Sequence, residues 1–311
     1  MKTKAFIYII IAGILWGTSG LFVHYLSPYG FSSIQMTAVR GLVSFIGISI
    51  YTFLTDRKLF KFSPRDFIFF VPIGTTLFST AALYYASMTM TSVSTAVVLM
   101  YMAPVYVMIF SVLFLGESFS GLKLASLTAM LIGCSFVSGI IGGLKFDAVG
   151  ILLGILSGVS YAIYNIVTKV ALKKGISAVT ATVYSFLVMA IIAVSSSKPH
   201  KIVTIAIENP LPTIPLLIGL GIFTFVVPYF LYTLAMRDLP AGTAAALGIV
   251  EPMAATVFSV LFLSENLGWL PAIGIILILV SVFALGKAED SKKEQKNIIT
   301  DKENDYELHK N

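Results

Sequence analysis

Charged side chains are scarce in this chain of 311 residues: Asp, Glu, Lys and Arg together make up 12%, whereas hydrophobic residues make up 57%. A soluble domain has about 25% charged residues. The apolar residues form long runs with short polar breaks, which indicates a protein with several transmembrane helices in a lipid bilayer. The net charge of +6 does not indicate a nucleic-acid partner, because the basic residues lie at the ends of these runs, where a bilayer would place them.

The side chains that most enzymes and metal sites need are also scarce. The single cysteine, Cys134, lies in an apolar run, which excludes an internal disulfide and a cysteine metal cluster. No Walker lysine loop is present, so ATP is not the expected energy source. Every Asp lies outside the apolar runs, and no His lies deep enough in one to activate a serine. We therefore expect no enzyme activity, no cofactor and no bound metal.

The apolar runs predict an all-α membrane protein with ten transmembrane helices. Each run approaches or exceeds the roughly 20 residues that a helix needs to cross the hydrocarbon core. Helices are expected because the backbone must satisfy its own hydrogen bonds in lipid, and alternating barrel strands are absent. The predicted spans are Ala5–Leu26, Ser32–Leu54, Phe67–Met88, Ser92–Leu115, Ser120–Ile141, Val149–Leu172, Ile176–Ser195, Thr213–Met236, Ala241–Leu263 and Leu267–Gly286.

An internal repeat organises these spans. The stretch Leu99–Glu117 and the stretch Leu247–Glu265 share nine of nineteen residues without a gap when one is shifted by 148 positions. Each stretch has a proline in its middle (Pro104 and Pro252) and ends on a glutamate. The chain is therefore predicted to contain two copies of one unit, residues 1–143 and 144–286, followed by a disordered charged cytoplasmic tail, residues 287–311.

The positions of the basic residues predict the orientation of the helices. With a cytoplasmic N-terminus, the cytoplasmic connections hold eleven Lys and Arg and the outer connections hold three, so both termini are expected in the cytoplasm. Five helices per copy is an odd number, so the second copy must enter the membrane the opposite way up. Inverted repeats of this kind are typical of secondary transporters, whose binding sites lie near the membrane midplane.

A carboxyl group in the middle of an apolar span is the strongest candidate for a functional group. Glu251 directly precedes Pro252, which removes a helical hydrogen bond. An ionised carboxylate at this depth is costly, so the residue must be protonated, paired or in contact with a wet cavity. We expect Glu251 to take up a proton or to pair with a cationic group of the substrate; the structural alternatives are a permanent pair with Arg40, or permanent protonation with a hydrogen bond to a neighbouring helix.

Arg40 and several aromatic residues lie within other spans. Arg40 keeps its positive charge, so it is expected to bind a substrate carboxylate through two hydrogen bonds, to pair with Glu251, or to clamp helices together. Trp16 lies mid-span, where its indole N–H needs a partner; it faces either a cavity or a packed core. The other candidates for a cavity wall are hydroxyl and amide side chains, with bonding between helices as their alternative role: Tyr84, Tyr101, Tyr161, Tyr164, Asn165 and Tyr229.

The whole pattern resembles the EamA-type branch of the drug/metabolite transporter superfamily. The resemblance covers nearly the whole chain from Phe6 to about Leu285. The residues that carry it are Trp16-Gly17, Arg40, Ala82–Ala86, Ala103-Pro104, Gly116-Glu117, Glu251-Pro252 and Ser264-Glu265. It implies a multi-pass transporter in a bacterial-type cell membrane, with a central cavity lined by helices 1–4 and 6–9 and with helices 5 and 10 as peripheral supports.

We therefore predict a secondary active transporter of a small-molecule substrate, with export of an amino acid or a related metabolite as the favoured case and proton coupling through Glu251. A broad multidrug exporter is the alternative within transport. A membrane enzyme or receptor that uses Glu251 is the alternative in another class, and the inverted repeat argues against it. A homodimer formed through the outer helices is also compatible with the sequence, which does not establish the oligomeric state.

Overall fold

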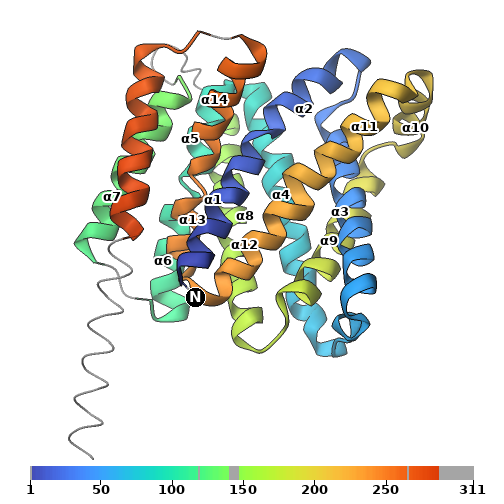
Figure 1. Ribbon diagram of the computed structural model, residues 1–311, viewed down its shortest axis with the longest axis horizontal. Helices are drawn as coiled ribbons and strands as arrows, with labels where there is room; N and C mark the ends of the chain where they lie inside the picture. Colours follow the sequence, from blue (N-terminus) through green and yellow to red (C-terminus); the bar gives the residue numbers. More distant parts are fainter. Residues whose placement is uncertain (1, 118–119, 140–146, 265, 287–311) are drawn as a thin grey trace, which may run out of the picture.

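The computed structural model describes residues 2–117, 120–139, 147–264 and 266–286, and these residues form an all-helical bundle (Figure 1). Nine helices in this part of the chain are long and apolar enough to cross a membrane; the apolar helix α7 (Gly121–Val137) is shorter. The all-α prediction is confirmed, whereas the count of ten spans and the cytoplasmic termini stay predictions. Glu265 and the predicted tail, 287–311, lie outside the described residues.

The helices of the first half precede residue 140, and those of the second half follow residue 146. The first half contains α1 (Lys2–Gly17), α2 (Ser19–Leu26), α3 (Ser33–Thr55), α4 (Phe67–Met90), α5 (Val93–Tyr101), α6 (Ala103–Leu115) and α7. The second half contains α8 (Ala148–Lys173), α9 (Ala178–Ser196), α10 (Pro199–Glu208), α11 (Pro210–Gly221), the π-helical turn η4 (Ile222–Val226), α12 (Val227–Asp238), α13 (Ala241–Leu247), α14 (Val250–Leu263) and a final helix, Trp269–Gly286. The short helix α10 was not predicted.

Polar caps explain where several of these helices begin. The side chains of Ser32, Ser92, Ser120, Asp147 and Ser177 each accept a hydrogen bond from a backbone N–H in the first turn of the helix that follows. A cap of this kind satisfies one of the donors that a helix N-terminus leaves free. Polar breaks between apolar runs therefore mark helix starts as well as loops.

The two repeated stretches are broken helices, which corrects the prediction of one continuous helix in each. The first divides into α5 and α6 at Met102, two residues before Pro104. The second divides into α13 and α14 at Gly248 and Ile249, just before Pro252. The reason is that a proline removes one helical N–H and its ring collides with the carbonyl group four residues earlier.

The repeated ends of these stretches also have one backbone conformation. Gly116 ends α6 with φ 65° and Ser264 ends α14 with φ 56°, both in the left-handed region. Glycine adopts this conformation without strain, whereas serine has a Cβ atom that disfavours it. The second copy therefore keeps the left-handed backbone conformation of the first at this position, although serine is less suited to that conformation than glycine.

Helices from the two halves of the chain pack against each other throughout the bundle. The helix α1 contacts α12 and α14, α3 contacts α9, and α4 contacts both α8 and α9. In Figure 1, α5 and α6 descend through the bundle whereas α13 and α14 ascend, which is the antiparallel relation that inverted repeats require. The interface between the two halves therefore runs through the centre of the molecule.

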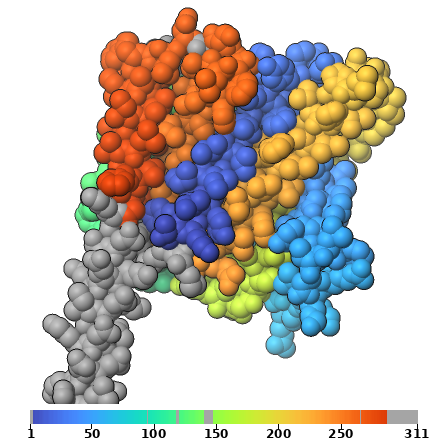
Figure 2. All heavy atoms as spheres, viewed as in Figure 1, coloured from blue at the N-terminus to red at the C-terminus, as the bar shows by residue number. Residues whose placement is uncertain are grey.

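The sides of the bundle carry large apolar side chains. In the repeated stretches, Leu113 and Phe114 of α6 and their counterparts Leu261 and Phe262 of α14 are all exposed. The final helix and α14 form one edge of the molecule in the space-filling view (Figure 2). Exposed apolar side chains on membrane-length helices are suited to contact with lipid, so each copy turns the same residues of its repeat outward.

Candidate functional site

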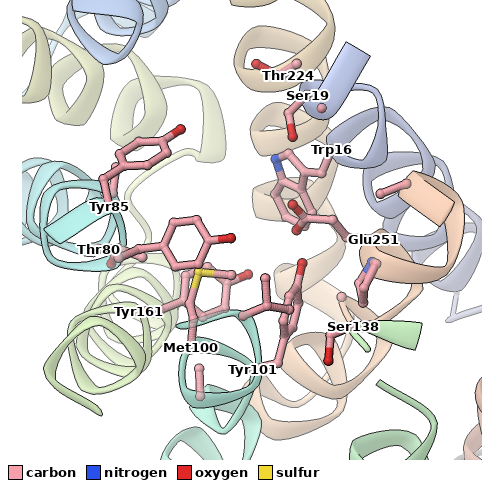
Figure 3. Close-up of a pocket in the computed structure, with 18 of the residues that line it drawn as sticks. Trp16, Ser19, Thr80, Tyr85, Met100, Tyr101, Ser138, Tyr161, Thr224 and Glu251 are labelled. Carbon is pink, nitrogen blue, oxygen red and sulfur yellow. The ribbon is translucent and has the colours of Figure 1, made fainter. Parts of the chain in front are cut away.

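A cavity of about 410 Å³ lies between the two halves of the bundle (Figure 3). Its walls come from the α1–α2 junction, the first part of α3, the second part of α4, the α5–α6 break, the end of α7, α8, η4 with the start of α12, and the α13–α14 break. The end of α7, which lies in the fifth predicted span, therefore lines the cavity rather than only supporting it from outside. It therefore lies toward the end of the bundle at which α4 ends and α5 begins, the upper end in Figure 1. Val93, the first residue of α5, lines the cavity and is 58% exposed, so the cavity reaches the surface there.

Glu251 faces this cavity from the first turn of α14. The break before α14 places the carboxyl group at a helix N-terminus, where the free N–H groups and the helix dipole favour negative charge. The side chain of Tyr101, the last residue of α5, lines the same cavity and points toward Glu251 (Figure 3). The two helix breaks thus bring the carboxyl and the phenol together from opposite halves of the chain.

Arg40 lines the same cavity from α3 and is buried, with 7% of its surface exposed. Its Nη1 atom donates a hydrogen bond of 3.3 Å to the Tyr85 hydroxyl, and its guanidinium carbon lies 5.9 Å from the centre of the Phe225 ring. Its Nε and Nη2 atoms have no hydrogen-bond partner within the described part of the chain. Among the described residues, Arg40 therefore forms no ion pair with Glu251. Its contacts with Tyr85 of α4 and Phe225 of η4 are compatible with the other structural alternative, a clamp between helices.

Trp16 is both a cavity residue and a core residue. Its ring packs edge to face against Tyr229, with the ring centres 5.0 Å apart, and against Tyr232 at 5.3 Å. The indole Nε1 is buried and has no partner among the residues that the structure describes. The cavity therefore has a second buried donor without a partner besides Arg40.

The remaining predicted site residues divide into two groups. Cavity-lining positions are occupied by Tyr84, Tyr101, Tyr161, Tyr229 and the two prolines of the repeats, Pro104 and Pro252. Deeper positions are occupied by Tyr164 and Asn165, which are both buried. The Asn165 side chain accepts a hydrogen bond from Tyr232 and donates one to the Tyr161 carbonyl oxygen. Both of its polar ends are thus occupied by the protein.

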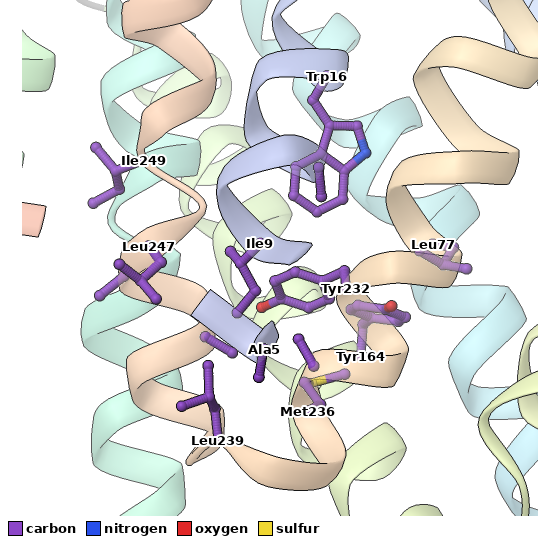
Figure 4. Packing of buried hydrophobic residues seen from close by; sticks show 14 of the residues in the cluster. Ala5, Ile9, Trp16, Leu77, Tyr164, Tyr232, Met236, Leu239, Leu247 and Ile249 are labelled. Carbon is purple, nitrogen blue, oxygen red and sulfur yellow. The ribbon is translucent and has the colours of Figure 1, made fainter. Parts of the chain in front are cut away.

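The opposite end of the bundle is filled by side chains. Tyr164, Tyr232, Met236 and Leu247 belong to the main buried cluster, which also contains the cavity residue Trp16, and these four residues lie together on one side of Trp16 (Figure 4). Tyr232, Met236 and Leu247 are fully buried. The cavity thus ends at a packed aromatic and aliphatic layer.

Two charged residues, Lys169 and Glu117, form hydrogen bonds with the backbone at this closed end. Lys169, near the end of α8, is buried and donates hydrogen bonds from Nζ to the carbonyl oxygens of Met236 and Leu239, where α12 ends. Glu117 accepts a 3.0 Å hydrogen bond from the backbone N–H of Ala241, the first residue of α13. Glu117 follows α6 of the first half, so this hydrogen bond joins it to the start of a helix in the other half of the chain.

A multi-pass helical bundle whose two halves enclose a buried cavity with a carboxyl group and a guanidinium group is the architecture of a membrane transporter. The sequence profile of the EamA-like transporter family matches residues 3–139 and matches again at residues 148–286. The chain belongs to the EamA-like transporter family.

Three proteins with similar sequences are named as transporters. An uncharacterized transporter of Archaeoglobus fulgidus is 29% identical over 278 residues, which are 88% of this chain and 93% of the relative. An uncharacterized transporter of Clostridium kluyveri is 24% identical, over 93% of this chain and 96% of the relative. The uncharacterized transporter YwfM of Bacillus subtilis is 21% identical, over 92% and 95%.

A solved crystal structure shares the fold. It is 16% identical in sequence, covers 94% of this chain with 100% of its own length, and has a TM-score of 0.76. The family and the fold agree with the expectation of a membrane transporter that is not an enzyme.

Proposed function

We propose that this protein is a secondary active transporter that exports a small organic metabolite, such as an amino acid, across the cytoplasmic membrane. The observation that carries the proposal is the cavity between the halves, which combines a buried carboxyl group, a buried guanidinium group and aromatic walls within membrane-length helices. Its volume of about 410 Å³ lies in the range of about 300–1,000 Å³ of small-molecule sites.

The closed and open ends of the bundle support an alternating-access cycle. The two proposed repeats, residues 1–143 and 144–286, would rock against each other and open the cavity to one side at a time. The cavity reaches the surface at Val93, and the opposite end is sealed by the packed layer and the Lys169 hydrogen bonds. With the predicted cytoplasmic N-terminus, this arrangement is an outward-facing state, from which an exporter releases its substrate.

Glu251 is proposed to couple this cycle to protons. When the cavity closes around it, an ionised carboxylate without a cationic partner would be left in the membrane interior, which is costly. The closed states therefore require Glu251 to be either protonated or paired with a cationic group of the substrate. A proton and a substrate that compete for one carboxylate would be exchanged across the membrane in opposite directions.

A broad multidrug exporter is the second candidate, and the composition of the cavity wall favours it in one respect. Met100 and several aromatic rings line the cavity, and such side chains adapt to ligands of different shape. The buried Arg40 and Glu251 favour a substrate with charged groups instead. Competition by an uncharged hydrophobic compound would therefore support the multidrug alternative.

The test is flux into proteoliposomes that contain the purified protein, driven by an imposed pH gradient, with a mixture of labelled amino acids. Wild type is expected to accumulate at least one of them, and Glu251→Gln is expected to lose accumulation driven by the pH gradient. The matched control is Glu208→Gln, which neutralises an exposed glutamate of α10 outside the cavity. An unchanged rate and pH profile in Glu251→Gln would end the proton-carrier role, and no flux of any amino acid in wild type would contradict the proposed substrate.

A further inference from the structure

We propose that Arg40 is the binding site for a carboxylate group of the transported solute, which Nε and Nη2 would hold through two parallel hydrogen bonds. This inference rests on the proposed transport function, because it names the chemical class of the solute in the same cavity. Arg40 is 93% buried and lines the cavity, yet these two donors have no partner in the described ranges of the chain. A buried guanidinium with two free donors is a site built for an acceptor that the protein itself does not supply.

The contacts of Arg40 select one edge of the guanidinium group for the ligand. Tyr85 accepts the hydrogen bond of Nη1, and the Phe225 ring lies 5.9 Å from the central carbon. These contacts hold the group in place from α4 and η4, which belong to different halves of the chain. The edge that remains, formed by Nε and Nη2, carries two N–H groups that point the same way at a spacing that matches the two oxygens of a carboxylate.

The Trp16 indole N–H, the other buried group of the cavity wall without a hydrogen-bond partner, also requires an acceptor. Trp16 Nε1 is also a buried donor without a partner among the described residues, so the three buried unpartnered atoms of the wall, this one and Nε and Nη2 of Arg40, are all donors. The bound solute must therefore supply acceptors. A simple cation, such as an organic amine, would leave these donors unsatisfied and would place a second positive charge near Arg40.

Glu251 supplies the complementary charge in the same cavity. When it is ionised, the described lining residues carry one positive and one negative side chain, Arg40 and Glu251. This distribution suits a solute with a carboxylate and an ammonium group better than one with a single charge. Export of an uncharged compound would have to proceed with both side chains desolvated and unpaired, which is unfavourable.

The test measures thermal stability of the purified protein with sets of probes that differ only in the carboxylate. The first set is leucine, leucinamide and isoamylamine; the second is phenylalanine, phenylalaninamide and phenethylamine. A ligand that binds the folded state raises the melting temperature by an amount that grows with the logarithm of its concentration divided by its dissociation constant, so concentration series give relative affinities. We expect at least one amino acid to stabilise wild type, and its amide and amine to bind at least tenfold more weakly.

The variants Arg40→Lys and Arg40→Gln then assign the effect to this side chain. Lysine keeps the charge but lacks the two parallel donors, so both variants are expected to lose at least tenfold in affinity for the amino acid, while the affinity for the amide changes little. The matched control is Arg57→Lys, which changes an exposed arginine outside the cavity. If an Arg40 variant does not fold, the comparison of acid and amide on wild type still decides the question.

Three results would overturn the carboxylate site: equal binding of acid and amide by wild type, full affinity of Arg40→Lys for the acid, or stabilisation by none of the acids. The proposed transport function can be refuted independently of this binding site. If the acids bind through Arg40 but proteoliposomes show no flux, the site is correct and the transport proposal is wrong; if amines cross the membrane independently of Arg40, the reverse holds.

Discussion

The crossing of α1 and α14 beside the cavity allows a graded test of how tightly the two halves must pack. Gly13 and Gly17 of α1 face α14, whereas Gly20 of α2 lines the cavity and has open space around it. A Cβ atom at Gly17 would lie 2.7 Å from the Ala254 Cβ and 2.8 Å from the Ala255 backbone nitrogen. At Gly13, the nearest atom would be the Val250 Cβ at 3.1 Å.

These distances give the expected size of the effect. An alanine at Gly17 forces the helices apart by about 1 Å, because carbon atoms pack at about 3.5–4.0 Å. The obstacle is backbone as well as side chain, so a rotamer change cannot relieve it, and overpacking of this kind costs about 1–3 kcal/mol. At Gly20, no described atom lies within 4 Å of the new methyl group, and the loss of glycine's backbone freedom stabilises the helix by up to about 1 kcal/mol.

We therefore expect Gly17→Ala to be about 2 kcal/mol less stable than the matched control Gly20→Ala, with Gly13→Ala between them. The measurement is the free energy of unfolding in mixed detergent micelles, followed by helical circular dichroism. The same series in the flux assay should show loss of transport at Gly17, because the start of α14 carries Glu251. Equal stability of Gly17→Ala and Gly20→Ala would refute the close contact between α1 and α14.

Three further substitutions test contacts between elements that are distant in sequence. Glu117→Gln keeps the shape but weakens the hydrogen bond to the Ala241 N–H, and we expect a loss of about 1 kcal/mol in the free energy of unfolding. Tyr232→Phe leaves the buried Asn165 side-chain oxygen without its donor, and we expect a loss of about 1–3 kcal/mol, measured in the same way. Lys169→Met removes two charge-assisted hydrogen bonds to the end of α12; we expect faster hydrogen exchange of that helix end and a loss of about 2 kcal/mol.

Each of these substitutions has a control with the same chemistry at an exposed position. The controls are Glu208→Gln for the carboxylate, Tyr25→Phe for the phenol and Lys173→Met for the amine, the last of these one turn further along α8. They are expected to change the free energy of unfolding by less than about 0.5 kcal/mol. A variant no less stable than its control would show that the corresponding contact contributes nothing to the closed end of the bundle.

The architecture of the bundle was largely predictable, because its signals are local or periodic. Long apolar runs indicate membrane helices, and the 148-residue repeat predicts two similar halves. The repeat also places a proline at matching positions, yet its effect was underestimated: Pro104 and Pro252 lie in the first turn of a new helix rather than within a continuous one. The reason is that the lost hydrogen bond at each proline coincides with a helix break at Met102 or Gly248, and no apolar pattern records such a break.

The candidate site was predictable only in its composition. Burial in an apolar span marks Glu251 and Arg40 as unusual, and the structure places both on one cavity together with Trp16 and Tyr101. It also separates Asn165 from this group, since Tyr232 and the Tyr161 backbone occupy its polar atoms. A pattern of residues along one helix cannot distinguish these cases, because the partners come from helices that lie far away in the chain.

By itself, the sequence determined that this is a helical membrane protein of two related halves, because hydrophobicity and repetition are properties of the chain in order. Only the tertiary structure decided which polar groups find partners. It joins Glu117 to a helix of the other half, 124 residues away, and it leaves two donors of Arg40 free within the described residues while Tyr85 occupies the third group. The physical reason is that such pairings depend on how helices cross and rotate, and these are set by packing over the whole bundle.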